Sequence, residues 1–552
     1  MREKAIGILL MWGSLLLTGN LPAETKRRIV FNDDAQSLME APAEGTERFI
    51  RDFIHREVAR TPITTFVYLA ATPDICLYDS KVGEVYGDRL GKAFDQKYAP
   101  GIRAFRAQGT DVLKVVTSEI RARGMEMLAA VRMGDTHHMA IAETVPLCPR
   151  FAIQHPEYVI RQPDGRTNET ALDYSHPEVR SHRLAVMREL AENYDIDGLE
   201  LDFCRWAKFF PRDQGLEKAP IMTEFVGQVR RMLNETAAKR GRKKAVLGVR
   251  VPDTIRTCWL AGLDPETWVR NGWIDYLTIS TWNEADPQIK ADEFARFTKG
   301  RTQLLVSMGN MMGGYWNGLP KIVDRGSAQF HPNYYGMLLT ADEARAFAYN
   351  YYAWGADGIH FWNISCEMGD KGGFTGPAQR ERTYAWMNVV TSPGKVLEGV
   401  RRYHYLPLHK WAKRRAPPER NYPWYGIRQS PLGTVRTQIL EFSEAGVRRT
   451  YQFRMADGRN GEKLNGTLRF PIYFIDPEDR IEIDVNGRPV PYSKVRRIAC
   501  DREKIGLPGA WFEVALADCP PFRGDNELGI ILHTERKREP VPYMEELDIT
   551  VR

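Results

Sequence analysis

The stretch that decides the fold is Tyr-Asp-Ile-Asp-Gly-Leu-Glu-Leu-Asp-Phe, residues 194–203. Its second half alternates apolar and acidic residues. A β-strand has a side-chain period of two, so Leu199 and Leu201 face one side while Glu200 and Asp202 face the other. Two acids on one buried face are costly unless they are paired or hydrated. The stretch therefore predicts a buried strand that carries acidic groups into an interior.

Similar short runs, rich in Val, Ile and Leu, recur between about residues 27 and 395. Together they predict eight strands, at 28–31, 63–70, 126–131, 198–203, 245–251, 276–281, 304–308 and 358–362. Amphipathic segments typical of helices lie between several of them, at 176–194, 222–239 and 342–354. This alternation predicts an α/β fold, the (β/α)8 TIM barrel. A doubly wound sheet is the alternative, but no glycine-rich phosphate fingerprint follows the first strand.

Beyond about residue 400 helical periodicity disappears. Strand-like runs separated by Gly, Asn, Asp and Pro turns lie at 451–455, 466–475, 480–485, 511–516, 528–533 and 547–551. Asn486-Gly487 is a strong hairpin signal. We expect a β-sandwich accessory domain over 399–552 after a catalytic barrel over 24–398. Supporting the barrel is a more common role for such a module than binding carbohydrate.

The N-terminus is typical of a secretory signal peptide. Arg2 and Lys4 form a basic start, residues 5–17 are mostly apolar, and Ala23 is a suitable cleavage point. The apolar run is too short for a comfortable membrane span. We therefore expect a signal peptide over 1–23 and a secreted or periplasmic mature protein.

The amino-acid composition indicates which classes of partner the protein could bind. The chain has 552 residues and a net charge of only +6, which does not favour nucleic-acid binding and gives mild support to an anionic polysaccharide. It has 13 Trp, and flat aromatic faces suit sugar rings. The seven cysteines show no metal-binding spacing, although Cys500 and Cys519 could pair. Neither a cofactor nor a metal is expected.

Polar and aromatic residues follow most of the predicted strands. In a barrel the carboxyl ends of the strands converge on one face, where catalytic groups lie. The candidate site residues on this face are Asp34, His137, Glu200, Asp202, Arg250, Trp282, Glu284, Asn310 and Trp362.

The two acids of the fourth strand have different expected roles. Glu200 lies one layer deeper, and we expect it to pair with a cation such as Arg250 on the next strand. Asp202 lies nearer the mouth, where a substrate can reach it. The competing interpretation is a buried ion-pair network that holds the barrel together.

Residues 171–180, Ala-Leu-Asp-Tyr-Ser-His-Pro-Glu-Val-Arg, and the stretch 194–203 together resemble bacterial glycoside-hydrolase-like barrel proteins. This resemblance implies a glycosidase-type barrel. Asp202 also resembles the nucleophile position of the α-galactosidase-like clan, whose acid/base follows strand six, where Glu284 stands here. The chitinase-type motif does not match, because Cys204 occupies the place of its glutamate.

Glycoside cleavage needs one carboxylic acid and a second carboxylate as nucleophile or base. We predict Asp202 as nucleophile or base and Glu284 as acid, in a glycoside hydrolase that acts on a poly- or oligosaccharide. The other polar candidates would hold sugar hydroxyls or tune these acids. Trp282 and Trp362 would stack against the sugar. Tyr315 and Trp316, in the glycine-rich loop 313–318, could cap the site, and a plain turn is the equal alternative for this loop.

Two other functions stay open. A metal-dependent hydrolase could draw its ligands from Asp33, Asp34, Asp135, His137 and His138, although no His-x-His follows the first strand and no HExxH is present. The second is a non-catalytic carbohydrate-binding barrel, because a fold does not guarantee chemistry.

Overall fold

The computed structural model describes residues 27–135, 140–161, 167–204, 207–281, 284–312, 337–364, 376–405, 438, 440–458, 464–500, 508–534 and 540–552. The predicted signal peptide lies outside this set. In the described chain, no helix is both long enough and apolar enough to cross a membrane.

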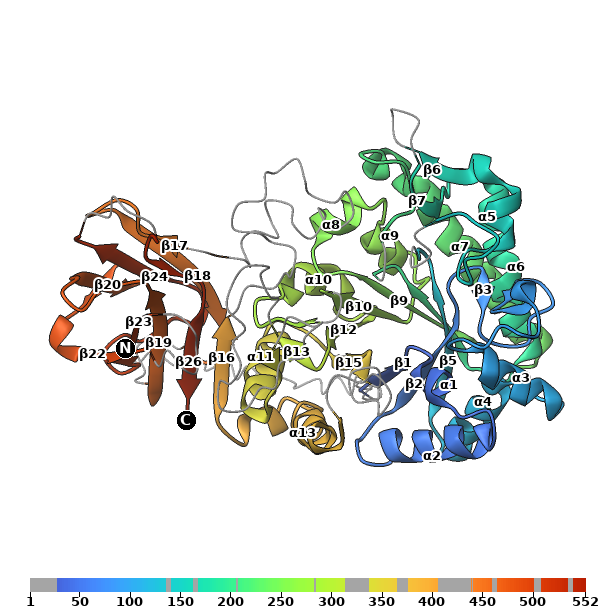
Figure 1. Cartoon of the computed structure of the whole chain (residues 1–552), viewed down its shortest axis with the longest axis horizontal. Coiled ribbons are helices and arrows are strands. Elements are labelled where there is room, and N and C mark those ends of the chain that lie inside the picture. The colour runs from blue at the N-terminus through green and yellow to red at the C-terminus, as the bar shows by residue number, and fades with distance from the viewer. Residues whose placement is uncertain are drawn as a thin grey trace, which may run out of the picture.

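Eight parallel strands form a closed barrel, which confirms the predicted fold class (Figure 1). The closure is made by β1, which pairs with β2 on one side and with β15 on the other. In chain order the barrel strands are β1 (Ile29–Asp33), β2 (Thr65–Ala71), β5 (Glu126–Arg132), β8 (Gly198–Asp202), β9 (Val246–Pro252), β10 (Tyr276–Ser280), β12 (Gln303–Met308) and β15 (Gly358–Trp362). Each agrees with its predicted strand to within about two residues, because short apolar runs are a local signal.

Helices surround the barrel (Figure 1). They include α2 (Thr46–Val58), α4 (Val112–Ala122), α6 (Pro177–Asn193), α7 (Gly215–Lys239), α9 (Pro265–Arg270), α10 (Ala291–Thr298), α11 (Ala341–Ala353) and α13 (Gly376–Val389). The three predicted helices are confirmed as α6, α7 and α11. However, α7 begins seven residues before its predicted start and contains Pro220. Proline usually marks a helix boundary, which is why the sequence pattern places this start too late.

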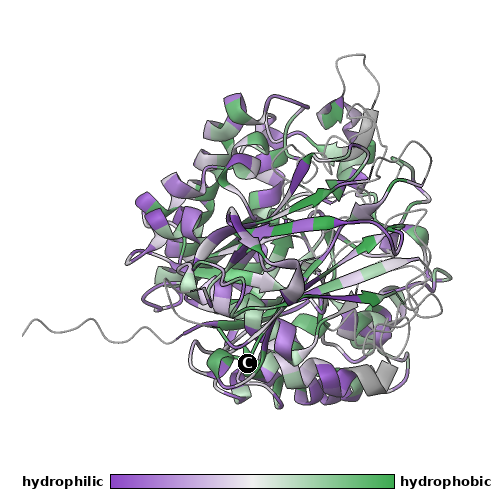
Figure 2. Ribbon diagram, turned by 90° about the vertical axis from the view of Figure 1, so that its left-hand side faces the viewer, coloured by the Kyte–Doolittle hydropathy of each residue, from purple (hydrophilic) through white to green (hydrophobic). Residues whose placement is uncertain are grey.

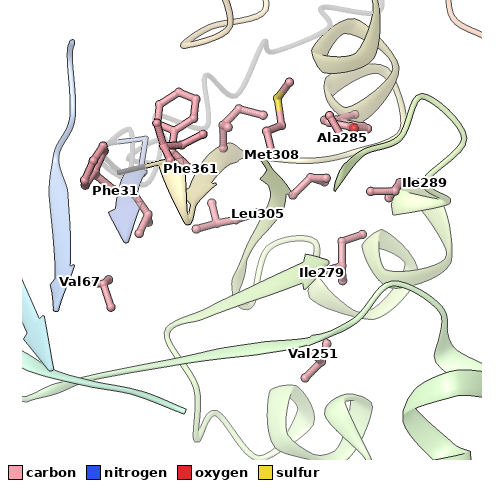
Figure 3. Close-up of a cluster of buried hydrophobic side chains, with 14 of the residues drawn as sticks. Phe31, Val67, Val251, Ile279, Ala285, Ile289, Leu305, Met308 and Phe361 are labelled. Carbon is pink, nitrogen blue, oxygen red and sulfur yellow. The ribbon is translucent and has the colours of Figure 1, made fainter. Parts of the chain in front are cut away.

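The barrel core is built from alternating strand residues. Strands are largely green and the outer turns of the helices often purple in Figure 2. Figure 3 shows hydrophobic side chains contributed by neighbouring strands, among them Phe31, Val251, Ile279, Leu305 and Phe361. All five are fully buried.

The C-terminal part forms two antiparallel sheets, as predicted. In the larger sheet the strand order is β16 (Arg401–Tyr405), β26 (Leu547–Val551), β19 (Gly466–Tyr473), β23 (Gly509–Ala515) and β22 (Val495–Ala499). The short strands β17 (Leu440–Glu441) and β25 (Tyr543–Met544) lie beside it. In the smaller sheet the strand order is β18 (Arg448–Met455), β24 (Gly524–Leu532), β20 (Ile481–Val485) and β21 (Arg488–Val490). The sheets face each other, since the rings of Tyr405 and Phe453 lie 5.9 Å apart.

Two local predictions in this region have different outcomes. The Asn486-Gly487 hairpin is confirmed: it joins β20 to β21, with φ of 56° and 72°. Both values are positive, as a type I′ turn requires. The possible Cys500–Cys519 disulfide is wrong, because each is a buried thiol. Cys500 instead packs with Tyr473 and Tyr543.

The sheets pack against the barrel through α11, which lies beside β16 (Figure 1). The buried carboxylate of Glu343 on α11 accepts from His404 at 3.2 Å and pairs with Arg402 at 3.1 Å. Burial alone would raise the pKa of Glu343, but the His404 hydrogen bond and the Arg402 charge lower it. Asn350, also on α11, bonds the backbone of Arg454 and Ala456 on the sheet side. These contacts join the sheets to the barrel.

Candidate functional site

The candidate site begins with the register of three neighbouring strands. Parallel pairing sets Arg132 on β5 opposite Asp202 on β8, and Asp202 opposite Arg250 on β9. All three stand at the carboxyl ends of their strands, which is the catalytic face of a barrel. The structure therefore places an anion between two cations at this end of the barrel.

Asp202 is held by one of its two carboxylate oxygens. Its Oδ1 accepts from Nη1 of Arg250 at 2.8 Å and from the backbone N–H of Cys204 at 2.9 Å. Within the described part of the chain, Oδ2 takes no hydrogen bond, and the side chain is 5% exposed. The carboxylate is thus fixed in orientation while one oxygen stays available.

Arg250 is fully buried and makes contacts on three sides. Besides Asp202, it donates from Nη2 to Oγ of Ser280 at 2.9 Å. Its guanidinium lies 3.9 Å from the ring centroid of Trp362. The expected pairing of Glu200 with Arg250 is wrong as a direct contact: Tyr276 donates to the Glu200 carboxylate, while Arg250 acts on Glu200 through its charge.

Glu200 lies deeper, as expected from the strand period, and is fully buried. Its Oε2 accepts from the hydroxyl of Tyr276 at 2.7 Å and lies 3.7 Å from Nδ1 of His360. Burial, aided by the charge of Asp202, raises the pKa of Glu200 to about 8. Burial and the charge of Arg250 lower the pKa of His360 well below its usual value. Both groups are therefore neutral near pH 7.

Arg132 links two strand ends across the barrel mouth. Its Nη1 donates to Asp135 at 2.6 Å, and its Nη2 contacts both carboxylate oxygens of Asp34. Burial alone would lower the pKa of Arg132, but the charges of Asp34, Asp135 and Asp202 raise it. Asp34 is thus an ion-pair partner of Arg132 in this structure.

A metal site, as in the alternative of a metal-dependent hydrolase, would need the same acidic residues as ligands. Asp34 and Asp135 bind Arg132, and Asp33 accepts from Ser37 and Gln36 at the start of a short helix. Burial raises the pKa of Asp33 to about 7. Over the residues that the structure describes, no three His, Cys, Asp or Glu side chains gather as a metal site would require. His137 and His138 lie outside those residues.

Asn310 and Trp362 are both buried near the strand ends. Oδ1 of Asn310 accepts from Oγ1 of Thr383 at 3.0 Å and from Nε1 of Trp386 at 2.9 Å, both on α13. Trp362 is 1% exposed and has Arg250 against its ring. The sugar contacts predicted for Asn310 and Trp362 stay predictions.

The remaining candidates fall wholly or partly outside the described residues. His137, Trp282, Tyr315 and Trp316 are not among them. The backbone of Glu284 is described: it lies in β11 (Glu284–Ala285), which pairs with β13 (Met311–Met312) just beyond the end of β10. In the barrel only β9 separates β10 from β8.

Arg132, which follows the third predicted strand, and Ser280 were given no role from the sequence. Both belong to the inward-facing set of their strands, so the period-two alternation used for Asp202 would have placed them inside. Their partners were not readable from that alternation, because Arg132 reaches Asp34 over the intervening β2.

Comparison with known proteins agrees with the resemblance of residues 171–203. Residues 63–215 match the family model described as Glycosyl hydrolase-like 10, and this range contains Arg132 and Asp202. No curated protein matches the chain.

Solved structures are similar at low identity. The PgaB (BpsB) glycoside hydrolase domain from Bordetella bronchiseptica shares 12% identity over 66% of this chain and 99% of its own, with a TM-score of 0.42. Alpha-L-fucosidase isoenzyme 2 from Paenibacillus thiaminolyticus shares 10% identity over 68% of this chain and 51% of its own, with a TM-score of 0.41. This chain thus spans about half the length of that fucosidase.

Proposed function

From the premise that residues 63–215 belong to the glycosyl hydrolase-like 10 family, we propose that this protein hydrolyses glycosidic bonds of a poly- or oligosaccharide. The observation that carries the proposal is the hydrogen bonding of the Asp202 carboxylate. Its Oδ1 is anchored by Arg250 and the Cys204 amide, while Oδ2 is left without a described partner. A nucleophilic or basic carboxylate needs this arrangement, because one oxygen must be oriented and the other must react.

Glu284 completes the carboxylate pair in this proposal, as the acid that protonates the leaving oxygen. Its support is its position, since the β10 end lies two strands from the β8 end. A carboxyl separation of about 5–5.5 Å would make the enzyme retaining, and one of roughly 6.5–9.5 Å would make it inverting.

The other site residues have proposed roles around this pair. Arg250 orients Asp202, and neutral Glu200 lies beneath it. Asp34 acts through its contact with Arg132, or holds a sugar hydroxyl. His137, Asn310, Trp282 and Trp362 are proposed as further sugar contacts.

The test is a hydrolysis screen against a polysaccharide library with the wild type, Asp202→Asn and Glu284→Gln. We expect each variant to lose about 10³-fold or more in kcat on any substrate that the wild type cleaves. The matched control is Asp197→Asn, in the same strand region but at the opposite end of the barrel, where Asp197 binds Arg121. This control should keep wild-type activity. Full activity in Asp202→Asn would refute the proposal.

A non-catalytic carbohydrate-binding barrel is the second candidate. The ion pairs Arg250–Asp202 and Arg132–Asp34 favour it, because such a network also suffices to tie strand ends together. This candidate predicts saccharide binding without turnover, and binding that survives Asp202→Asn. Calorimetric titration with the saccharides of the screen separates the two functions.

We also propose that the mature protein is secreted or periplasmic. The support is the basic start and the apolar run of the first 23 residues. Mass spectrometry of the exported protein should find an N-terminus after Ala23, whereas retention of Met1 in the mature chain would contradict export by cleavage.

A further inference from the structure

Both donors that hold the Asp202 carboxylate also contact Ser280, the last residue of β10. Ser280 is 1% exposed. Its Oγ accepts from Nη2 of Arg250 at 2.9 Å, and its backbone carbonyl accepts from the thiol of Cys204 at 3.3 Å. Neither Ser280 nor the Cys204 thiol has a role in the proposed reaction.

These contacts complete a closed ring of four hydrogen bonds. From Oδ1 of Asp202 the ring passes to Nη1 of Arg250 at 2.8 Å, and from Nη2 of Arg250 to Ser280. From the carbonyl of Ser280 it passes to the thiol of Cys204, whose backbone N–H donates to Oδ1 at 2.9 Å. The ring therefore links the carboxyl ends of β8, β9 and β10, which are neighbours in the barrel.

The register of β9 and β10 explains why Ser280 can reach Arg250. Thr278 is the direct partner of Arg250, and Ser280 lies two residues further along β10. Paired residues of neighbouring strands face the same side of a sheet, and the period of two gives Ser280 the same face as Thr278. The Ser280 hydroxyl thus lies on the same interior face of the barrel as the Arg250 side chain.

Ser280 restricts a rotation of the guanidinium that the contact with Trp362 leaves open. The guanidinium carbon of Arg250 lies 3.9 Å from the ring centroid of Trp362, and this contact restricts how the plane of the guanidinium tilts. Rotation within that plane would still turn Nη1 away from Asp202. Because the hydrogen bond to Ser280 opposes this rotation, Nη1 stays directed at Oδ1.

The thiol contact has a similar effect on the second donor. Cys204 follows the end of β8, and its backbone N–H donates to Oδ1 from the chain that leaves the strand. The carbonyl of Ser280 holds the Cys204 side chain and so ties this part of the chain to β10. With one donor from β9 and one from the chain after β8, the carboxylate cannot rotate without losing a hydrogen bond.

We propose that Ser280 is a positioning residue for Asp202 and acts through Arg250 and Cys204. This role rests on the proposed function, in which Asp202 is the reactive carboxylate. It adds the reason why Oδ2 is the reacting oxygen: both donors of the ring engage Oδ1.

The test opens the ring at each of the two Ser280 bonds, on a substrate from the hydrolysis screen. Ser280→Ala removes the hydroxyl, and Cys204→Ala removes the thiol. We expect Ser280→Ala to lower kcat by about tenfold and to change KM by less than about twofold, because a rotated carboxylate reacts slowly while the substrate still binds. Cys204→Ala should lose less, because S–H is a weak donor.

Conservative and double variants separate positioning from packing. Ser280→Thr and Cys204→Ser keep a hydrogen-bonding group at each position and should recover most of kcat. The double variant Ser280→Ala/Cys204→Ala should lose less than the product of the two single losses, because one broken bond already opens the ring.

A second readout needs no turnover. The chain has seven cysteines, so labelling with ¹⁵N-cysteine gives at most seven backbone amide signals in NMR. The Cys204 signal is assigned by its loss in Cys204→Ser, and it reports the hydrogen bond to Oδ1. We expect Ser280→Ala to move this signal upfield, in the same direction as Asp202→Ala, which removes the acceptor.

Two matched controls remove similar bonds outside the ring. Thr302→Val removes a buried hydroxyl that donates to the carbonyl of Ile274 at the opposite end of the barrel. Cys519→Ala removes a buried thiol that donates to the carbonyl of Ala515 at 3.4 Å in the C-terminal sheets. Both controls should keep kcat and the position of the Cys204 signal.

A Cys204 signal that does not move in folded Ser280→Ala overturns the inference. If Ser280→Ala does not fold, Ser280→Val takes its place, because it has the shape of the threonine variant without the hydroxyl. Since the amide signal does not depend on turnover, a wild type without hydrolytic activity would overturn the proposed function alone.

Discussion

Nη1 of Arg250 lies 2.8 Å from Oδ1 of Asp202, and the two residues are direct neighbours in the register of β9 and β8. This ion pair is almost wholly buried, and Ser280 and Trp362 hold the guanidinium from two other sides. The pair therefore joins the strand ends and orients the carboxylate at the same time.

Arg250→Met should lower the free energy of unfolding by about 3–5 kcal/mol, because it leaves the buried Asp202 without its partner. Urea denaturation measures the loss. The double variant Arg250→Met/Asp202→Asn should lose less than the sum of the single variants, because the pair is coupled. Arg270→Met is the control: its pair with Glu266 is exposed and should contribute less than about 1 kcal/mol. Equal losses in the two arginine variants would contradict the assignment.

Glu200→Gln should change how stability depends on pH. The pKa of Glu200 in the folded protein is about 8, above its ordinary value, so the folded state binds more protons than the unfolded chain between about pH 4.5 and 8. The free energy of unfolding then falls as pH rises through this window, by up to about 1.4 kcal/mol per pH unit. The glutamine variant should lose much of this slope in urea denaturation series from pH 5 to pH 9.

Asp33 contributes a slope of the same sign, since burial raises its pKa to about 7. Asp33→Asn is thus the matched comparison, and the two substitutions together should flatten the profile further. An unchanged slope in Glu200→Gln would mean that Glu200 is ionised in the folded protein at neutral pH.

Asn350→Ala should weaken the contact between barrel and sheets. Its amide donates to the carbonyls of Pro287 at 2.7 Å and Arg454 at 3.0 Å, and its carbonyl accepts from Ala456 at 2.7 Å. Leaving these buried groups unsatisfied should cost about 3 kcal/mol. Thermal unfolding and limited proteolysis report the loss. Gln228→Ala, which removes an exposed hydrogen bond to Glu224, should change stability by less than about 0.5 kcal/mol.

Gly487→Ala should destabilise the β20–β21 hairpin by about 1 kcal/mol. The reason is the backbone alone: Gly487 has a φ of 72°, which disfavours any Cβ, and nothing lies within 4 Å of an added one. Gly394→Ala is the control, because Gly394 has equally open space but a φ of −68°. Denaturant unfolding measures the loss. An equal loss of stability in the two alanine variants would argue against the type I′ turn.

Local signals in the sequence predicted most of the architecture. The eight barrel strands follow from short runs rich in Val, Ile and Leu, and the hairpin follows from two residues that tolerate positive φ. Period-two alternation also put Glu200 and Asp202 on the inner face, with Glu200 the deeper of the two. All of these features depend on residues that are close in sequence.

The partners of the charged groups could not be predicted from local patterns in the sequence. The sequence suggested Arg250 as the cation for Glu200 and allowed a Cys500–Cys519 disulfide, whereas in the structure Arg250 binds Asp202, Tyr276 binds Glu200 and both cysteines are thiols. The register between neighbouring parallel strands depends on the crossovers and on barrel closure, which no local pattern encodes. The contact of Arg132 with Asp34 spans an intervening strand for the same reason.

The sequence by itself thus determined the eight-stranded barrel, the following sheets and the acidic fourth strand. Only the tertiary structure decided that Asp202, and not Glu200, receives Arg250, and that Arg132 stands on its other side. The physical reason is that strand formation depends on local side-chain patterning, whereas the neighbours of a buried charge depend on how distant strands align when the barrel closes.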